Sequence, residues 1–417
     1  MFYARHHLLI TIVLVLALLP GCGGGGGTRV AGGTDPPTSR AITTVEEAKK
    51  PGAWTILVYL DADNDLEADG MNNLSQMEVI GSVADVRVIV QIDRIPGYDA
   101  GFGDWTDTRR YLVIRDTNAS VMSSIRLDAP ALGELDMADW RTLKDFVEWG
   151  TREFPADHYC LVVWDHGSGW QMRASELAPH YKYVVSDETS SNGMNVTEIP
   201  SALSGLNVDV VAFDACLMQQ FEVAYELSGS AAYMVGSAAA EPSPGYNYSW
   251  LLARLEGSTT PEQLCRAIVE SYAQTYPAPR RAITQCAVDL SKITNVATAA
   301  GNFAEMLATS GVDLSGARQT AVNYSSVDGG VDLHYLELID YAGKCATAVG
   351  SGAQASYNSL SEAMASAVVS ETHSTDLAAS HGVGVYVPAP SAYDFKYGRL
   401  RFATDTYWDE WIRTQIR

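Results

Sequence analysis

Two side chains in this sequence, the thiol of Cys216 and the imidazole of His166, have the chemistry of a nucleophile and its base. Cys216 follows the apolar run 208–213, and a helical pattern begins near Phe221. A short, apolar run predicts a strand covered on both faces. Cys216 is therefore expected between the carboxyl end of a strand and the amino end of a helix, where ligands bind and a thiolate is favoured. A buried core cysteine is the alternative.

His166 ends a second apolar run, 159–164, and is followed by Gly167. Two strands that each end in one half of a nucleophile–base pair can bring the halves together at one sheet edge. A thiolate at Cys216 would attack a carbonyl, and His166 would protonate the leaving group. The backbone N–H groups of Cys216 and Gly167 are candidate donors to the oxyanion. Asp165 is adjacent to His166, but neighbours on an extended chain point apart, so it is assigned no orienting role.

These motifs resemble the clostripain family within the caspase-fold clan of cysteine peptidases. His166 precedes Cys216 by 50 positions, the separation typical of caspases. The resemblance rests on Trp164-Asp165-His166-Gly167-Ser168-Gly169-Trp170, on Asp214-Ala215-Cys216-Leu217-Met218, and on Glu222-Val223-Ala224-Tyr225-Glu226. It implies a cysteine endopeptidase with a Cys-His dyad that cuts polypeptides after Arg or Lys. It also implies maturation by cleavage between the two strands, for which Lys182 is the candidate self-cleavage point.

Asp214 lies two residues before Cys216 and is therefore expected on the same side of the strand. A carboxylate there could bind a substrate Arg or Lys, and the resemblance assigns Asp214 to that specificity pocket. The alternative is an Asp that caps the following helix. Glu241, in the turn-rich segment 241–248, is a second and weaker candidate for the pocket. Some relatives carry an extra acid near the position of Pro244, and its absence here weakens the case for a strict basic preference.

Three other residues have reactive side chains but fit the pattern less well. His381 is followed by glycine, but it precedes its strand and is expected at the opposite sheet edge. Ser168 lacks the glycine that a nucleophile elbow requires two positions earlier, so a turn residue is the better interpretation. Cys160 lies inside a strand and is expected in the core.

Residues 1–21 have the positive start and apolar core of a signal peptide. Leu19-Pro20-Gly21-Cys22 resembles a bacterial lipobox, in which Cys22 carries the lipid anchor; an ordinary secreted protein is the alternative. Residues 22–50 include a Gly/Pro/Thr-rich tether. Residues 51–250 are expected to form the catalytic domain and 251–417 a helical carboxyl-terminal part. The chain is therefore predicted to be exported and held at the cell envelope, at the outer membrane or a periplasmic face.

The formal net charge of −22 argues against nucleic acid as a partner, because phosphate binding needs clustered Lys and Arg. Five cysteines remain beyond Cys22, so at least one thiol is unpaired in any disulfide arrangement. No zinc-ligand spacing occurs, and no metal is assigned. The acidic run Asp61, Asp63, Asp65 and Glu67 lacks the EF-hand spacing, so helix-capping acids are favoured over a calcium loop. No cofactor is expected to be required, and bound calcium is the alternative because carboxylates are hard ligands.

Strands alternating with helices predict an α/β fold with a mostly parallel sheet, and the resemblance implies a caspase-like three-layer sandwich. The Ala-rich helical carboxyl-terminal part is expected to return two strands, 282–290 and 382–387, to the central sheet. The leading function is an exported cysteine endopeptidase. The alternatives are a catalytically silent caspase-fold binding lipoprotein and an acyl transferase that uses the same thiol.

Overall fold

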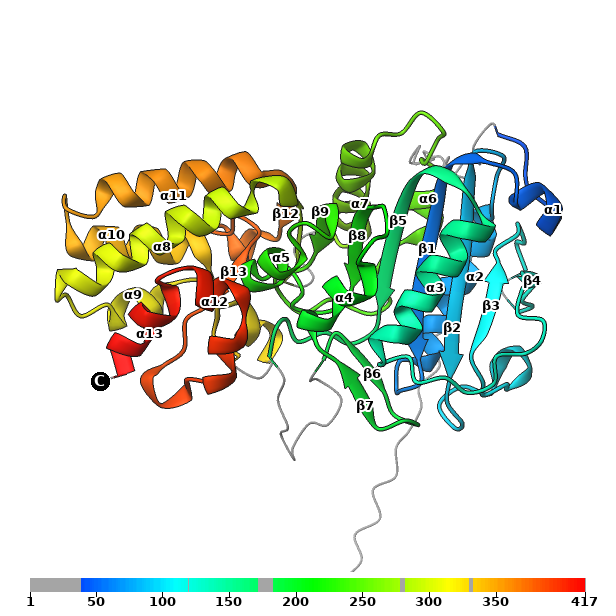
Figure 1. Cartoon of the computed structure of the whole chain (residues 1–417), viewed down its shortest axis with the longest axis horizontal. Coiled ribbons are helices and arrows are strands. Elements are labelled where there is room, and N and C mark those ends of the chain that lie inside the picture. The colour runs from blue at the N-terminus through cyan, green and yellow to red at the C-terminus, as the bar shows by residue number, and fades with distance from the viewer. Residues whose placement is uncertain (1–38, 119, 172–182, 278–281, 330–332, 417) are drawn as a thin grey trace, which may run out of the picture. The chain divides into compact units, whose positions relative to one another are not determined.

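One large sheet organises the part of the chain that the structure, a computed structural model, describes: residues 39–118, 120–171, 183–277, 282–329 and 333–416. Nine strands in these residues follow the order β12-β10-β9-β8-β5-β1-β2-β3-β4 (Figure 1). The five mutually parallel strands are β1 (Gly52–Ala62), β2 (Val86–Arg94), β5 (Ala156–Trp164), β8 (Val208–Asp214) and β9 (Ala231–Gly236). The antiparallel strands at the two edges are β3 (Arg109–Leu112), β4 (Ile125–Arg126), β10 (Thr284–Asp289) and β12 (Val368–His373).

Successive side chains of the central strands enter two separate apolar cores, one on each face of the sheet. Leu57 and Tyr59 of β1 belong to one core, and Ile56, Val58 and Leu60 belong to the other. The first core includes side chains of the helices α3 (Trp140–Glu153), α4 (Ile199–Leu203) and α5 (Phe221–Leu227), and it continues into helices of the carboxyl-terminal half. The helices of the second core are α2 (Glu67–Ile80), α6 (Tyr248–Leu252) and α7 (Pro261–Thr275). Figure 1 shows α3 in front of the sheet and α2 behind it. The predicted three-layer α/β sandwich is confirmed.

The remaining helices and short strands lie mostly in the carboxyl-terminal half. The helices are α1 (Val45–Ala48), α8 (Ile293–Ser310), α9 (Ser315–Thr320), α10 (Leu338–Val349), α11 (Gln354–Ala367), α12 (Arg401–Asp405) and α13 (Trp408–Ile416). Two small sheets pair β6 (Val185–Asp187) with β7 (Asn192–Met194), and β11 (Tyr335–Glu337) with β13 (Gly384–Tyr386). Among the residues described, none of the helices combines the length and apolar character needed to cross a bilayer.

The carboxyl-terminal strands join the sheets differently from the expectation. The strand expected at 282–290 does rejoin the central sheet, as β10. The strand expected at 382–387 does not, because β13 pairs with β11 instead. The edge of the central sheet is formed by β12, a strand that was not predicted. Asp35–Arg417 form one compact unit, to which β10 and β12 contribute the sheet edge.

The strand β13 instead supports the segment that follows Cys216. The N–H of Gly384 donates a hydrogen bond to the carbonyl of Gln219 at 3.0 Å. A Cβ atom at position 384 would lie 2.0 Å from Oε1 of Gln220, so any larger residue would require the Gln220 side chain to move. The carboxyl-terminal half therefore braces the cysteine loop directly.

Cys160, Cys216, Cys265, Cys286 and Cys345 are all free thiols. Cys216 alone of the five is partly exposed, and the other four are buried. The predicted signal peptide, most of the tether, the anchor residue Cys22 and the self-cleavage candidate Lys182 lie outside the described residues.

Candidate active site

The register of β5 and β8 brings His166 and Cys216 to one edge of the sheet. Trp164 pairs with Asp214 as the last residues of the two parallel strands, and His166 and Cys216 each follow two residues later. A Cβ atom on Gly167 would lie only 2.1 Å from the carbonyl oxygen of Cys216. The two loops are therefore in backbone contact, and glycine at 167 is what permits it.

The imidazole of His166 is held by Asp65, from the loop after β1. Its Nε2 lies 2.7 Å from Oδ1 of Asp65, and only 6% of the His166 side chain is exposed. Burial by itself lowers the pKa of His166, but the hydrogen bond to Asp65 and the charges of Asp165, Asp65 and Glu188 outweigh it, so the pKa is raised overall. Asp65 thus favours the imidazolium. Sequence reasoning missed this partner, although it noted the acidic run that contains it.

Asp165 has a different task from Asp65. Its carboxyl accepts hydrogen bonds from the N–H of His166 at 2.5 Å, from Nδ2 of Asn64 at 2.8 Å, and from the N–H of Ser186. Burial raises its pKa to about 7. The side chain therefore ties its own loop to the loop after β1 and to β6, and among the hydrogen bonds of the described residues none joins Asp165 to the imidazole ring.

Cys216 sits in a tight loop rather than at a helix end. Cys216 lies between the end of β8 and the start of α5 at Phe221, as expected, but four residues separate the cysteine from the first residue of the helix. Leu217 adopts φ +62°, a left-handed conformation rare for a leucine, and its N–H donates to Ala239 at 3.0 Å. Such strain at a site needs support from the surrounding structure. The N–H of Glu241 lies 3.1 Å from Sγ of Cys216 and is directed to stabilise negative charge on sulfur.

A cavity of about 160 Å³ opens beside these two residues. Its acids are Asp69, Asp165, Asp214 and Glu241, and no Lys or Arg belongs to its lining. The lining residues are Leu66, Asp69, Trp164, Asp165, His166, Asp214, Ala215, Cys216, Glu241, Pro242, Ser243, Pro244 and Gly245. The cavity is thus acidic and reaches both the thiol and the imidazole.

Asp214 and Glu241 form the buried acidic end of this cavity. Asp214 accepts hydrogen bonds from the N–H of Tyr246 at 3.0 Å and from the hydroxyl of Tyr248 at 2.7 Å. It is 4% exposed, and burial raises its pKa to about 7. Its hydrogen bonds go to the 241–248 segment and not to α5, so the helix-cap alternative is not observed.

The Glu241 carboxyl lies against that of Asp214. Burial, and then the charge of Asp214, raise the pKa of Glu241 well above its usual range. Both Glu241 oxygens are buried, and no N–H or O–H of the described residues donates to them. Two acids in contact need a shared proton or a cation between them. A guanidinium or ammonium group would supply that cation.

The polypeptide supports this acidic end from several sides. Asn73 of α2 accepts a hydrogen bond from Nε1 of Trp164 at 2.7 Å and donates to the carbonyl of Pro244 at 3.0 Å. A Cβ at Gly245, where φ is +75°, would lie 2.3 Å from Oδ1 of Asp214. The 241–248 segment is therefore fixed against the end of β8.

A sequence model of the clostripain family, Peptidase_C11, matches residues 58–414. The chain belongs to the clostripain family of cysteine peptidases. Clostripain of Hathewaya histolytica is 28% identical over 235 residues, which make up 52% of this chain and 44% of that protein. The match thus spans less than half of clostripain's length.

Two solved structures share the fold of this clostripain-family chain. A secreted C11 cysteine protease from Bacteroides thetaiotaomicron, in complex with an irreversible peptide inhibitor, has a TM-score of 0.66 at 20% identity, covering 86% of this chain and 100% of that one. An inactive zymogen C11 protease from Parabacteroides distasonis has a TM-score of 0.64 at 20% identity, covering 86% and 99%. At this level of identity the likeness establishes the fold.

The three other reactive side chains, those of His381, Ser168 and Cys160, make contacts that stabilise the fold. Nδ1 of His381 lies 3.3 Å from Oε2 of the buried Glu337, and half of the His381 side chain is exposed. The Ser168 hydroxyl donates to the carbonyl of Gln171 at 2.9 Å. Cys160 is fully buried, and burial raises the pKa of its thiol.

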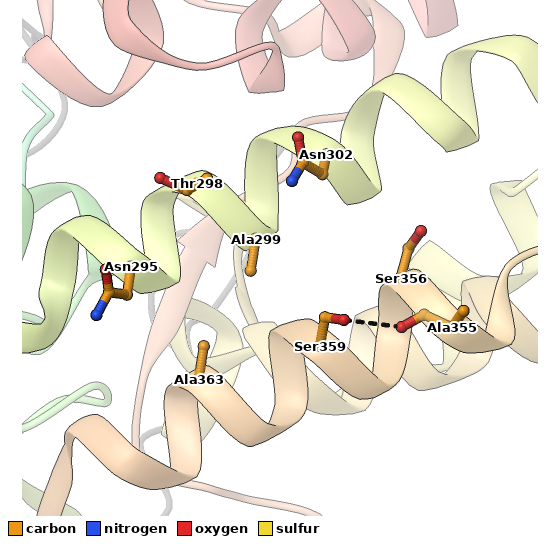
Figure 2. A pocket seen from close by; sticks show the side chains of 8 residues that line it. All are labelled: Asn295, Thr298, Ala299, Asn302, Ala355, Ser356, Ser359 and Ala363. Carbon is orange, nitrogen blue, oxygen red and sulfur yellow. Dashed lines mark hydrogen bonds between the residues drawn. The ribbon is translucent and has the colours of Figure 1, made fainter.

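A larger hollow of about 370 Å³ lies between α8 and α11 (Figure 2). It is lined by alanines and by hydroxyl or amide side chains, among them Asn295, Asn302 and Ser359. Figure 2 shows the Ser359 hydroxyl turned to the carbonyl of Ala355 in its own helix, a hydrogen bond of 3.1 Å. None of the lining residues is an acid, a base or a thiol, so the reactive groups are gathered in the smaller cavity.

Proposed function

We propose that this clostripain-family chain is a cysteine endopeptidase that cuts after Arg or Lys with Cys216 as nucleophile and His166 as acid and base. The observation that carries the proposal is the acidic cavity that reaches both side chains and ends at Asp214 and Glu241. Its size suits one long side chain, and its charge favours a basic one.

The first half of the reaction forms a thioester. The Cys216 thiolate attacks the scissile carbonyl carbon and the oxygen becomes negatively charged. The N–H groups of Gly167 and Cys216 are the proposed donors to that oxygen, and the Gly167 N–H makes no hydrogen bond to another described residue. As the carbon–nitrogen bond breaks, His166 gives its proton to the leaving amine.

The second half releases the enzyme. His166, now neutral, takes a proton from water as the water oxygen attacks the thioester carbonyl. The carbon–sulfur bond breaks, the new carboxyl terminus leaves, and the proton on His166 balances the regenerated thiolate. Asp65 holds the imidazole ring throughout and stabilises its protonated form.

Asp214 is the proposed direct partner of the substrate cation. Its carboxylate is fixed by Tyr246 and Tyr248, so it is preorganised to meet a guanidinium. Glu241 would lose its shared proton when the cation enters, giving a second negative contact.

Export and anchoring belong to the same proposal. The signal-like residues 1–21 and the lipobox-like segment at Cys22 support secretion with a lipid anchor at the bacterial envelope. A related fold is described as a secreted protease. Incorporation of a radiolabelled lipid precursor into the parent but not into Cys22→Ala tests the anchor; equal labelling of the two would contradict it.

The activity is tested with peptides that carry Arg, Lys or Asp before a fluorogenic leaving group. Cleavage after Arg or Lys that is lost in Cys216→Ala and in His166→Ala is expected. Cleavage that survives the Cys216 change would refute the site, and no hydrolysis of any peptide would favour a silent binding protein. Transfer of the acyl group to an added amine in preference to water would favour an acyl transferase.

Self-cleavage after Lys182 is tested separately by sequencing the amino ends of the purified parent and of Cys216→Ala. Two chains are expected in the parent and one in the variant. Replacement of Lys182 by Gln is expected to keep the chain in one piece, whereas two chains in all three proteins would rule out self-cleavage there.

A further inference from the structure

The loop that follows β2 presents an exposed aromatic ring at the histidine side of the active site. Tyr98 is 50% exposed, and its hydroxyl donates a hydrogen bond of 3.4 Å to Oε2 of Glu188, the residue directly after β6. A single exposed ring is ordinary on a protein surface. This ring differs because its loop is firmly held and because of the side chains that surround it.

The loop that carries Tyr98 is fixed by a buried ion pair. Nε of Arg94 lies 2.7 Å from Oε1 of Glu67, and both side chains are fully buried. The second Glu67 oxygen accepts the N–H of Asp99 at 2.6 Å, and Nη2 of Arg94 donates to the carbonyl of Asp99 at 2.6 Å. Both backbone polar groups of the residue after Tyr98 are thus bound, so the ring is preorganised for contact with a ligand.

The same contacts connect this loop to the partner of His166. Glu67 lies two residues after Asp65, whose Oδ1 is 2.7 Å from Nε2 of His166. The N–H of Glu188 donates to the carbonyl of Asp63, in the loop that carries Asp65, at 3.0 Å. The loops after β1, β2 and β6 are therefore tied together beside the imidazole.

The charges beside the ring are negative. The charge of Glu188, followed by burial and the charge of Asp65, raises the pKa of Tyr98, so the phenol stays neutral. Burial lowers the pKa of His166, but the hydrogen bond to Asp65 and carboxylate charges that include Glu188 outweigh it. The two acids thus act on the phenol and on the imidazole alike. A cation beside Tyr98 would meet an aromatic face and two carboxylates.

We propose that Tyr98, with the carboxylates of Glu188 and Asp65, binds an Arg or Lys side chain on the residue that follows the scissile bond. The inference rests on the proposed function, in which His166 protonates the leaving amine. The substrate beyond the bond therefore passes the histidine side. An aromatic face attracts a cation placed over it, and nearby carboxylates add to the attraction.

This subsite is separate from the cavity that takes the side chain before the scissile bond, because neither Tyr98 nor Glu188 belongs to the cavity lining. The enzyme would therefore prefer to cut between two basic residues. The self-cleavage candidate Lys182 is followed by Tyr183, which carries no positive charge. An intramolecular cut depends less on this preference, since both reactants belong to one chain.

The test uses internally quenched peptides in which one Arg is followed by Lys, Ala or Asp, with the cut located by mass spectrometry. For cleavage between Arg and that residue, the parent should show a kcat/KM about tenfold higher with Lys than with Ala, and lowest with Asp. Tyr98→Ala should reduce the Lys-to-Ala ratio by about twofold to fivefold. Tyr98→Phe keeps the ring and should retain most of the ratio, whereas Glu188→Gln should reduce it. High salt should also reduce it.

Tyr407→Ala is the matched control, because Tyr407 is another exposed tyrosine and lies outside the cavity lining. Its Lys-to-Ala ratio should equal that of the parent. Cleavage after Arg at equal rates in the three peptides, or the parent's ratio in Tyr98→Ala, would overturn the subsite and leave the proposed function in place. No cleavage of any peptide by the parent would refute the proposed function and this inference with it.

Discussion

Nε2 of His166 and Oδ1 of Asp65 lie 2.7 Å apart, although the two residues are 101 positions apart in the sequence. Asp65 has a half-exposed carboxylate, whereas the imidazole is buried. The contact thus links the buried ring to a charge at the rim of the cavity. It also turns the proposed Cys-His pair into a set of three residues, in which Asp65 acts through His166.

Asp65→Asn is expected to lower the pKa of His166, because the amide keeps the hydrogen-bonding shape and loses the charge that favours the imidazolium. The alkaline limb of the kcat/KM profile should move to lower pH, since His166 loses its proton earlier. At neutral pH a drop of about tenfold is expected from the charge-assisted bond. The pH profile on an Arg peptide measures this.

Asp69→Asn is the matched control for that experiment. Asp69 also lines the cavity, but no hydrogen bond joins it to His166 among the described residues. Its variant should keep the parent's alkaline limb. An unchanged limb in Asp65→Asn would show that the contact does not set the protonation of His166.

Asp214→Asn is expected to reduce kcat/KM on Arg and Lys peptides by about a hundredfold, the scale of losing one partner of a buried charge pair. A peptide with a neutral side chain at the same position should be affected far less. Glu241→Gln should have a smaller effect, since burial and the charge of Asp214 raise the pKa of Glu241 and favour its neutral form. Equal losses on basic and neutral peptides would argue for a structural role of Asp214.

Gly167→Ala is expected to displace the cysteine loop, because the new Cβ would lie 2.1 Å from the carbonyl oxygen of Cys216. A shift of about 1 Å at reacting atoms costs on the order of a hundredfold in rate. Thiol labelling rate and kcat/KM are the measurements. Gly316→Ala is the control, since nothing lies within 4 Å of its Cβ and alanine in a helix adds about 0.5–1 kcal/mol of stability. Parent-like activity in Gly167→Ala would contradict the close approach.

The raised pKa of Glu222, a residue outside the cavity lining, predicts that the stability of the fold depends on pH. Burial raises its pKa to about 7 in the folded chain, whereas the unfolded value is about 4.3. The folded state therefore holds the proton more tightly, and the free energy of unfolding falls as the pH rises between these values. Each pKa unit corresponds to about 1.4 kcal/mol.

Glu222→Gln should reduce the fall in the free energy of unfolding as the pH rises. The amide oxygen can still accept the N–H of Tyr386 and the hydroxyl of Tyr397, now bound at 2.9 and 3.0 Å. Urea unfolding of both proteins at pH 5 and pH 8 measures the difference. The same slope in parent and variant would mean that Glu222 does not carry it.

The sequence predicted what depends on local pattern. Apolar runs ending at Trp164 and Phe213 indicated two buried strands, and their ends located His166 and Cys216 on one edge. Asp65 could not be assigned in that way, because its contact depends on β1 lying next to β5 in the sheet order. A local sequence pattern predicts where a strand ends, but it does not predict which strands are neighbours in the sheet.

Two further misses have the same origin. Val368 begins a strand only because β10 offers a free edge for it, while the preceding Ala-rich run favours a helix. The carboxyl of Glu134 lies close to that of Asp63 because the hydroxyl of Thr108 accepts the N–H of Leu135 and so fixes the turn that carries Glu134. No spacing in the sequence indicates that these two acids are neighbours.

The carboxyl-terminal half supplies β10, which pairs with β9, and β12, which pairs with β10. It also supplies β13, whose Gly384 N–H donates a hydrogen bond to the carbonyl of Gln219. A truncation near residue 250 would leave one whole side of the β9 backbone without hydrogen-bond partners. Such an exposed edge promotes strand addition between molecules. It would also remove the brace from Gln219. Excising the segment that carries His166 and Cys216 as a minimal enzyme should therefore give an insoluble fragment, and protein engineering on this scaffold has to retain the distal helices.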